Sequence, residues 1–231
     1  MTDHKITIAI DGFSSTGKST VAKQLAKELS YVYVDTGAMY RAITLYAMRK
    51  GYIKKNSFDV AALIQDLPSL NLKFVFDTAL GYAAIYLNNE NIEDEVRTLE
   101  VSQYVSRVAA ISEVREKLVA QQQEMGLKKG VVMDGRDIGT VVFPNAELKI
   151  FMTATAEERA GRRFKEMKEK GQDVNYEEVL KNVMERDHLD TTREDSPLVK
   201  AEDAIEIDNS ALNIEEQFEK ILQLAETTIT A

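Results

Sequence analysis

The sequence lacks the residues that build covalent cross-links and many metal sites. Its 231 residues include no cysteine and only two histidines, His4 and His188, which stand far apart. Disulfide bonds, thiolate metal sites and a histidine-rich metal cluster are therefore excluded. We expect any metal ion to be Mg²⁺ held by oxygen atoms.

Long apolar runs are missing as well. No run approaches the roughly 20 residues of a membrane-spanning helix, and residues 1–12 lack the order of a secretory signal. With 44% hydrophobic and 29% charged residues, the composition is typical of a folded globular protein. We therefore expect a cytoplasmic chain without a membrane partner. We also expect a monomer, because no sustained apolar helix face indicates a dimer seam.

Net positive charge is absent, since the formal net charge is −9. Nucleic-acid binding relies on clustered Lys and Arg that neutralise phosphates, so we expect no nucleic-acid partner. Arginine nevertheless gathers locally, and we interpret it segment by segment. The segments are residues 97–115, 134–137, 158–163 and 186–193.

Apolar, strand-like runs alternate with helical patterns along the chain. The runs at 130–134 and 147–154 have the continuous apolar character of strands buried in a parallel sheet. The pattern predicts an α/β fold with a five-stranded parallel sheet, helices on both faces and a ligand crevice at the strand carboxyl ends. The expected strands are 5–10, 31–35, 130–134, 147–154 and 204–208, and the expected helices between and after them are 19–29, 36–51, 98–110, 112–126 and 213–228.

Two stretches interrupt this alternation. Residues 70–76 and 82–88 alternate in polarity, which predicts a small antiparallel sheet. Two charged helices are expected at about 156–170 and 176–189. Capping pairs predict where helices begin, and they are Thr155 with Glu158, Asn175 with Glu178, and Asn213 with Glu216 for the last helix.

A phosphate-binding loop lies between the first expected strand and the first expected helix. Residues 12–19 satisfy G-x-x-x-x-G-K-[ST] in the strand, loop and helix context that the motif requires. Glycine lets N–H groups converge on phosphate, Lys18 reaches the β and γ phosphates, and the Ser19 hydroxyl ligates Mg²⁺. A glycine-rich turn that only opens a helix is the alternative. The fold is thus predicted to be of the P-loop NTPase type, with donor contacts from Gly12, Phe13, Ser14, Ser15, Thr16, Gly17, Lys18, Ser19 and Thr20.

Longer motifs accompany the loop. They are IAIDG with GKST, DTGAMYRA (35–42), EVR (95–97), DGRDIGTVVFP (134–144), RDHLDTTR (186–193) and PLVKAEDAIEID (197–208). In this order the sequence resembles the bacterial cytidylate kinases over nearly its whole length, and the hairpin matches the extra small sheet of that family. The resemblance implies Mg²⁺-assisted, in-line transfer of the γ-phosphate of ATP to CMP or dCMP, which gives ADP and CDP or dCDP.

The resemblance also implies a division of the chain and a set of acceptor contacts. It implies one P-loop kinase domain, 1–231, with a core (about 1–36, 97–154, 196–231), an acceptor-binding insertion (about 37–96) and a helical lid (about 155–195). Taken singly, each contact residue has an alternative interpretation as a solvated helix residue or part of a surface ion pair. The implied contacts are Arg41 and Arg136 with the acceptor phosphate, Ser106, Arg115 and Asp137 with the base, Asp190 and Arg193 with the sugar, and Thr36 and Tyr40 nearby.

Arginines of the lid are candidates for catalysis. Arg159, Arg162 and Arg163 stand at i, i+3 and i+4, and Arg186 lies on the next helix. Arginines on a closing segment stabilise the charge of a metaphosphate-like transition state and exclude water. A solvated pair of charged helices is the alternative. The predicted catalytic set is Lys18, Arg159, Arg163 and Arg186.

We predict a role at the site for Asp134 and none for His188. Asp134 ends an expected buried strand near the loop, so we predict that it orients Mg²⁺ through water, with loop stabilisation as the alternative. His188 is expected to face solvent. No general base is needed, because the acceptor phosphate is already anionic.

Rival functions remain open at this stage. A UMP, AMP or shikimate kinase would share the loop and lid but lack DGRDIGTVV and the hairpin. A P-loop regulatory protein is the alternative outside enzymes, although a GTPase switch is disfavoured because no N-K-x-D element is present. Phe13 stands where the resembling enzymes often have proline, and Ser15 and Thr16 stand where smaller residues are common. The donor preference among ATP, dATP and GTP is left open, as is the preference among CMP, dCMP and UMP.

Overall fold

The computed structural model describes residues 5–54 and 57–230, which divide into two compact units. The first unit comprises the chain up to Val34 together with the chain from Gln123 onwards, and the second comprises Asp35–Gln122. His4 lies outside the described residues.

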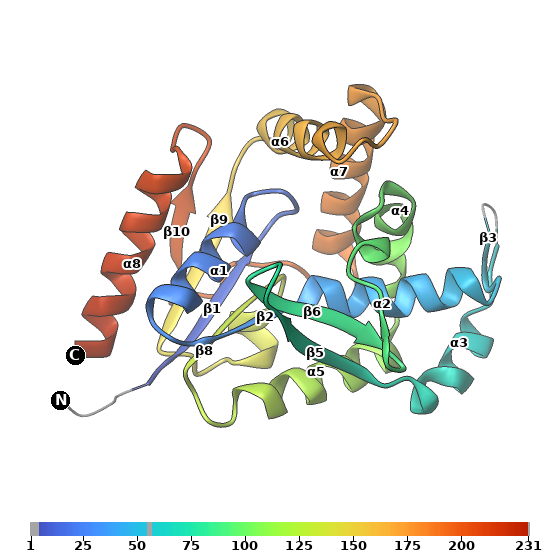
Figure 1. The fold of residues 1–231 in the computed structure, drawn as a ribbon, viewed down its shortest axis with the longest axis horizontal. Coiled ribbons are helices and arrows are strands. Elements are labelled where there is room, and N and C mark those ends of the chain that lie inside the picture. Colours follow the sequence, from blue (N-terminus) through green and yellow to red (C-terminus); the bar gives the residue numbers. More distant parts are fainter. Residues whose placement is uncertain (1–4, 55–56, 231) are drawn as a thin grey trace. The chain divides into compact units, whose positions relative to one another are not determined.

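The first unit contains the large sheet and the helices that flank it (Figure 1). Its strands are β1 (Thr7–Gly12), β2 (Val32–Asp35, whose last residue belongs to the second unit), β8 (Val131–Gly135), β9 (Leu148–Thr153) and β10 (Ile205–Asp208). Its helices are α1 (Lys18–Glu28), the end of α5 (Ser112–Gly126), the π-helical turn η3 (Ile138–Val142), α6 (Ala156–Glu169), α7 (Tyr176–Thr192) and α8 (Ile214–Thr230).

The sheet has the strand order β10-β9-β1-β8-β2. Strand β1 pairs in parallel with both β8 and β9, and β9 pairs in parallel with β10. The strand order reverses at β1, since the chain reaches β8 on one side of it and β9 on the other. In open parallel sheets ligands bind beyond the strand carboxyl ends at such a point. For β1 that end is Gly12, where the phosphate loop begins.

The core of this unit lies between the sheet and the helices α1 and α8. Alternate residues of β1, among them Ile8 and Ile10, face Leu25 of α1 and Ile221 of α8 and are fully buried. Alternation along a strand sends the residues between them to the opposite face. There η3 packs on β1 and β8, and Asp11 meets it. The predicted five-stranded α/β fold is confirmed.

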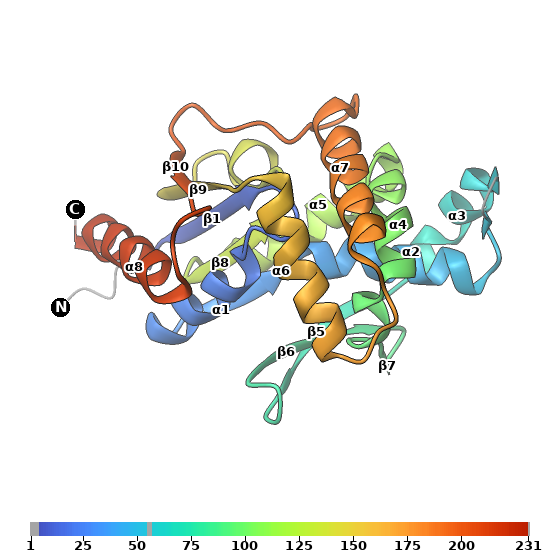
Figure 2. The same ribbon diagram turned by 90° about the horizontal axis from the view of Figure 1, so that it is seen from above.

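Helices α6 and α7 pack against each other, as Figure 2 shows. The rings of Phe164 and Tyr176 meet edge to face, with 6.1 Å between their centroids. All three predicted N-caps are confirmed, because the side chains of Thr155, Asn175 and Asn213 each accept a hydrogen bond from the backbone N–H three residues later.

The second unit combines helices with small antiparallel sheets. The predicted hairpin is confirmed as β5 and β6, to which β7 adds a third strand that the sequence did not predict. Its elements are α2 (Thr36–Arg49), β3 (Ile53–Lys54), β4 (Ser57–Phe58), α3 (Val60–Asp66), η1 (Leu67–Ser69), β5 (Leu72–Asp77), β6 (Tyr82–Leu87), β7 (Glu90–Asn91), η2 (Glu95–Arg97), α4 (Leu99–Val108) and most of α5.

The boundaries of the units differ from the predicted division. The sequence placed residues 97–122 in the core, but α4 packs on α2, so this stretch lies with the predicted insertion. The amphipathic pattern of α4 predicts a buried face and cannot specify which helix covers it. The description as one kinase domain with a separate lid stays a prediction. Among the described residues no helix is both long and apolar enough to span a membrane.

We predict that Gly12→Ala destabilises the protein far more than Gly171→Ala. Both glycines have a positive φ, 141° and 73°, a conformation that costs other residues about 1–2 kcal/mol. A Cβ at Gly12 would lie 2.0 Å from the backbone oxygen of Met152, whereas one at Gly171 meets nothing within 4 Å. Urea unfolding measures both losses. Equal losses would contradict the close packing of β1 on β9.

Candidate active site

The phosphate loop follows β1 and is held by contacts to its own backbone oxygens. Gly12 and Gly17 take the positive φ values of 141° and 88° that the loop requires. The Phe13 oxygen accepts hydrogen bonds from Lys18 Nζ at 2.5 Å and from Thr16 Oγ1 at 3.0 Å. Ser14, Thr16 and Lys18 are buried, and Thr20 is exposed in the first turn of α1. The loop thus has the backbone that binds phosphate through N–H groups.

Lys18 combines burial with nearby charges of both signs. Its side chain is buried at the amino end of α1. Burial, together with the positive charge of Arg136, lowers the pKa of Lys18 below its ordinary value, and Asp134 and Asp11 oppose this shift. An anion beside the ammonium group would raise that pKa again. This environment therefore favours an anionic ligand.

Ser19 and Asp134 lie side by side at the start of α1 and the end of β8. Ser19 Oγ donates to Asp134 Oδ2 at 2.9 Å, and Tyr33 Oη donates to Asp134 Oδ1 at 2.8 Å. A hydroxyl and a carboxylate are oxygen ligands of the kind that Mg²⁺ prefers. The predicted pair is therefore brought together, and Tyr33 is a partner that the sequence did not predict.

Two ion pairs connect the segment after β8 with α7 and its carboxyl end. Arg136 Nε donates to Asp190 Oδ2 at 2.8 Å, and Arg193 Nη2 lies 3.6 Å from Asp137 Oδ1. Asp137, Asp190 and Arg193 are buried, so the interpretation of Asp190 and Arg193 as a solvated surface pair is wrong. Burial tends to lower the pKa of Arg136, but Asp190 outweighs it and raises that pKa. Predicted acceptor residues of the first unit thus form a cluster of two ion pairs.

Asp11 supports this cluster from β1, and sequence reasoning missed it. Its Oδ1 and Oδ2 accept hydrogen bonds from the backbone N–H groups of Ile138 and Gly139 at 2.8 and 2.7 Å. Burial raises the pKa of Asp11 to about 7, although these two hydrogen bonds oppose the shift. The only available signal was the position of an acidic residue at the end of a strand. Asp11 ties the loop after β8 to the strand that carries the phosphate loop.

The predicted lid arginines are largely buried, which contradicts the alternative of a solvated helix pair. Arg159, Arg163 and Arg186 are between 4% and 8% exposed. Arg159 binds both oxygens of Asp187, while the half-buried Arg162 binds Asn209 instead. His188 is exposed, as predicted. Most of these guanidinium groups therefore lie inside the unit, although α6 also carries acidic side chains.

The predicted residues of the second unit come from α2, α4 and α5. Thr36 and Tyr40 are buried on α2, Ser106 is buried on α4, and Arg41 is half-buried. The guanidinium carbon of Arg115 lies 5.8 Å from the centre of the Tyr40 ring, a cation–π contact. Arg115 is 2% exposed, so a surface arginine is excluded at this position.

Asp35 is a further buried group at the start of α2 that the sequence analysis did not single out. Its Oδ1 caps α2 by accepting from Ala38 N at 2.9 Å, and Arg97 Nη1 donates to its Oδ2 at 2.7 Å. Burial alone would raise the pKa of Asp35, but Arg97 and then Arg41 lower it to about 2. The motif DTGAMYR contained the signal, since aspartate precedes a helix there. Asp35 and Arg97 thus fix the helix that carries Thr36, Tyr40 and Arg41.

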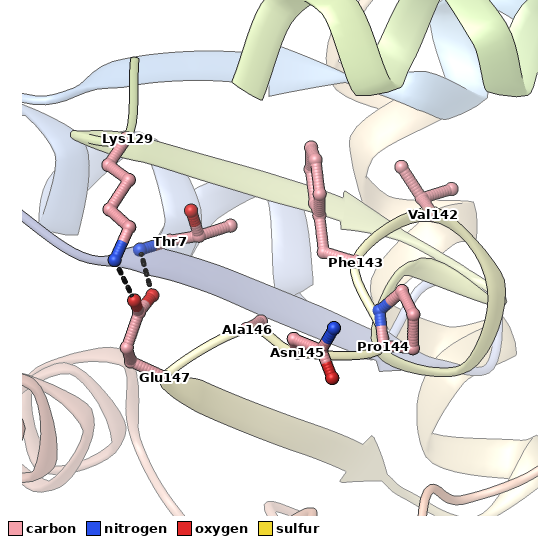
Figure 3. Close-up of a pocket in the computed structure, with 8 residues that line it drawn as sticks. All are labelled: Thr7, Lys129, Val142, Phe143, Pro144, Asn145, Ala146 and Glu147. Carbon is pink, nitrogen blue, oxygen red and sulfur yellow. Dashed lines mark hydrogen bonds and ion pairs between the residues drawn. The ribbon is translucent and has the colours of Figure 1, made fainter. Parts of the chain in front are cut away.

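A cavity of about 370 Å³ lies at the end of the large sheet where β1 and β9 begin (Figure 3). Thr7 and Glu147 stand at the amino ends of β1 and β9, and Lys129 and the Thr7 backbone N–H both bind the Glu147 carboxylate. Phe143 and Pro144 line its other side. Because the phosphate loop leaves the carboxyl end of β1, this cavity is separate from the candidate site.

The fold and the site define a phosphotransferase of the P-loop class, and comparison with known proteins identifies its family. The sequence model of the cytidylate kinase family matches residues 8–227. Relatives named cytidylate kinase occur in Flavobacterium johnsoniae, 67% identical and covering 97% of this chain and 98% of that protein, and in Flavobacterium psychrophilum, 66% identical and covering 95% and 97%. A third, from Bacteroides fragilis, is 55% identical and covers 98% and 99%.

The chain belongs to the cytidylate kinase family. This membership confirms the resemblance carried by DTGAMYRA and DGRDIGTVVFP, and the protein is accordingly a kinase that uses nucleotide substrates. The rival interpretations as a shikimate kinase or a regulatory P-loop protein are thereby overturned.

Asp11 gives the stability of the protein a pH dependence of unusual sign. Its folded pKa of about 7 lies above the ordinary 3.8, so its contribution to stability is full below pH 4 and is lost as the pH rises to 7. We predict that the free energy of unfolding of the wild type, relative to Asp11→Asn, falls by a few kcal/mol between pH 4 and 7, at about 1.4 kcal/mol per pKa unit.

Urea unfolding at a series of pH values measures this difference. Asp208→Asn is the control, because that exposed carboxyl has a lowered pKa through its hydrogen bonds to Ser210. Its removal should change the pH dependence in the opposite sense. A pH-independent difference for Asp11→Asn would contradict the raised pKa.

Proposed function

We propose that the protein transfers the γ-phosphoryl group of ATP to CMP or dCMP and releases ADP with CDP or dCDP. The observation that carries the proposal is the phosphate loop at the switch point of the sheet, in the same unit as the ion pairs of Arg136 with Asp190 and of Arg193 with Asp137. A P-loop regulator would need the first feature alone. A nucleoside monophosphate kinase needs both a donor site and an acceptor site.

The donor site uses the loop from Gly12 to Thr20. Backbone N–H groups of this loop bind the donor phosphates, and the ammonium group of Lys18 binds the β and γ phosphates. In the structure this ammonium group lies on the Phe13 oxygen. The arriving phosphates would take over that contact.

The acceptor contacts are those that the family motifs imply. Arg41 and Arg136 hold the acceptor phosphate, because guanidinium groups form paired, charge-assisted hydrogen bonds with phosphate oxygens. Ser106, Arg115 and Asp137 bind the cytosine, whose amino group needs an acceptor such as a carboxylate. Burial supports this assignment, because Ser106, Arg115 and Asp137 are each at most 4% exposed. Asp190 and Arg193 bind the sugar, and Thr36 and Tyr40 complete the set.

Catalysis rests on alignment and charge stabilisation. The acceptor phosphate is already anionic, so no side chain has to remove a proton. Arg163 and Arg186 stabilise the charge that spreads over the transferred group, and Lys18 stabilises the leaving diphosphate. Their burial excludes water, which strengthens each interaction and prevents ATP hydrolysis.

Ser19 and Asp134 would hold the Mg²⁺ that accompanies ATP. When bound, the ion neutralises phosphate charge during transfer. Ser19 would ligate it through its hydroxyl, and Asp134 through a water molecule. The 2.9 Å contact between these two side chains supports the assignment, since Mg²⁺ usually takes few protein ligands and keeps several waters.

We also propose that the enzyme works as a monomer in the cytoplasm and has neither a nucleic acid nor a membrane as a partner. The net charge of −9 supports the statement about nucleic acid. Sedimentation of the purified chain would test the monomer.

We predict that CMP and dCMP are better acceptors than UMP or AMP. A coupled assay of ADP formation at fixed ATP and Mg²⁺ measures kcat/KM for each monophosphate. Pyrimidines that lack the exocyclic amino group leave Asp137 without its donor, which is expected to cost tenfold or more, or about 1.4 kcal/mol. Equal values for AMP and CMP would overturn the acceptor assignment.

We further predict that Arg186→Ala lowers kcat at saturating ATP and CMP by about 100-fold or more. Arg163→Ala should act in the same direction, and Lys18→Ala should nearly abolish turnover. Glu185→Gln is the matched control, because Glu185 is exposed on the same helix as Arg186. An unchanged kcat in either arginine variant would remove that residue from the catalytic set.

A further inference from the structure

Two backbone oxygens of the phosphate loop are held by side chains of α6 and of the segment after β10. The Ser14 oxygen accepts a hydrogen bond from Arg159 Nη1 at 3.2 Å, and the Thr16 oxygen accepts one from Asn209 Nδ2 at 2.6 Å. Arg159 and Asn209 are 4% and 1% exposed. Both contacts are therefore shielded from competing water.

These contacts determine where two N–H groups of the loop point. A trans peptide is planar, so its C=O and the following N–H point in opposite directions. A held Ser14 oxygen thus orients the N–H of Ser15, and a held Thr16 oxygen orients the N–H of Gly17. Neither N–H donates to an acceptor within residues 5–54 and 57–230. Both are available to an anion on the side of the loop opposite the two contacts.

Several contacts with other segments of the protein hold the Arg159 side chain in place. Its Nε donates to the Ala154 oxygen at 2.9 Å, and Nη1 and Nη2 donate to the two oxygens of Asp187 on α7 at 2.9 and 2.5 Å. Its guanidinium carbon also lies 5.1 Å from the centre of the Phe13 ring, and that ring packs edge to face on Phe151. Phe13 therefore supports the arginine that holds the next residue of the loop.

Arg162 acts one turn further along α6 through Asn209. Its Nη1 donates to Asn209 Oδ1 at 3.1 Å and its Nη2 to the Asn209 backbone oxygen at 2.8 Å. Because Arg162 occupies the amide oxygen, the amide nitrogen faces the Thr16 oxygen and Gln217 Oε1, which accepts its other hydrogen. The orientation of the Asn209 amide is thus determined by its neighbours.

We propose that Arg159 and Arg162 are positioning residues for the donor nucleotide. They hold the Ser14 and Thr16 oxygens, directly and through Asn209, and so direct the N–H groups of Ser15 and Gly17 at the donor phosphates. This role replaces the catalytic role that the sequence predicted for Arg159, and it separates the pair from Arg163 and Arg186. The inference rests on the proposed function only in taking ATP as the ligand.

The dissociation constant of ATP, measured by calorimetry without CMP, tests the proposal. Arg159→Lys keeps the charge but cannot reach Ser14 and Asp187 together. We expect the dissociation constant to rise about tenfold in Arg159→Lys, Asp187→Asn and Arg162→Gln, as for the loss of one charge-assisted hydrogen bond. Phe13→Leu should raise it less, because it removes the cation–π contact with Arg159 and the ring contact with Phe151 but no hydrogen bond. The kcat at saturating ATP should stay within about threefold of the wild type in Arg159→Lys, Asp187→Asn and Arg162→Gln.

Phe164→Leu is the matched control. Phe164 contacts Tyr176 across α6 and α7 and also carries a cation–π contact, from Lys168, but it does not touch the phosphate loop. It should lower the melting temperature and leave ATP binding unchanged. An equal rise in the dissociation constant for Phe164→Leu would show that weaker packing between α6 and α7 causes the effect, and it would overturn the proposal.

Two other results would also overturn it. If Arg159→Lys lowered kcat 100-fold with unchanged ATP binding, Arg159 would be catalytic, and if it changed neither quantity the contacts would be packing only. Should Arg159→Lys fail to fold, Arg162→Gln and Phe13→Leu test the same prediction. A wild type that binds ATP but forms no CDP would contradict the proposed function. The comparison of ATP dissociation constants would still test the positioning role of Arg159 and Arg162.

Discussion

The close approach of Gly12 to β9 is the constraint on which the site depends. A side chain at this position would collide with the Met152 oxygen, so only glycine lets β1 stay paired up to the point where the loop turns away. The turn then places the loop at the carboxyl end of the central strand. There the strand order reverses, and a ligand can approach without displacing a neighbouring strand.

Polar side chains on β1, α6 and the segment after β10 connect this turn to the rest of the unit. Asp11 binds the N–H groups of the segment after β8, and Arg159 and Asn209 bind oxygens of the loop itself. Each contact joins segments that are distant in sequence. The phosphate loop is thereby held from α6 and the segment after β10, and the strand that precedes it holds the segment after β8.

The arginines of this protein fall into exposed and buried groups, which make different kinds of contact. Those on the outer faces of helices, such as Arg49, form exposed ion pairs of small energetic value. Arg115, Arg159, Arg163, Arg186 and Arg193 are buried, where an unpaired charge is costly and each contact is strong. A buried arginine therefore needs an anion or a fixed protein partner beside it.

The sequence by itself determined the fold class, the phosphate loop, the helix caps and the family, because these depend on local periodicity, on glycine and on residues a few positions apart. It also supplied the residues of the proposed acceptor set, through motifs such as DGRDIGTVV. Tertiary structure decided which charges meet. Asp190 binds Arg136 from a distant segment, Arg162 binds Asn209, and Arg159 contacts Phe13 and Asp187. A one-dimensional pattern gives the face of a helix but not the partner packed against it, so burial and contacts between distant segments required the folded chain.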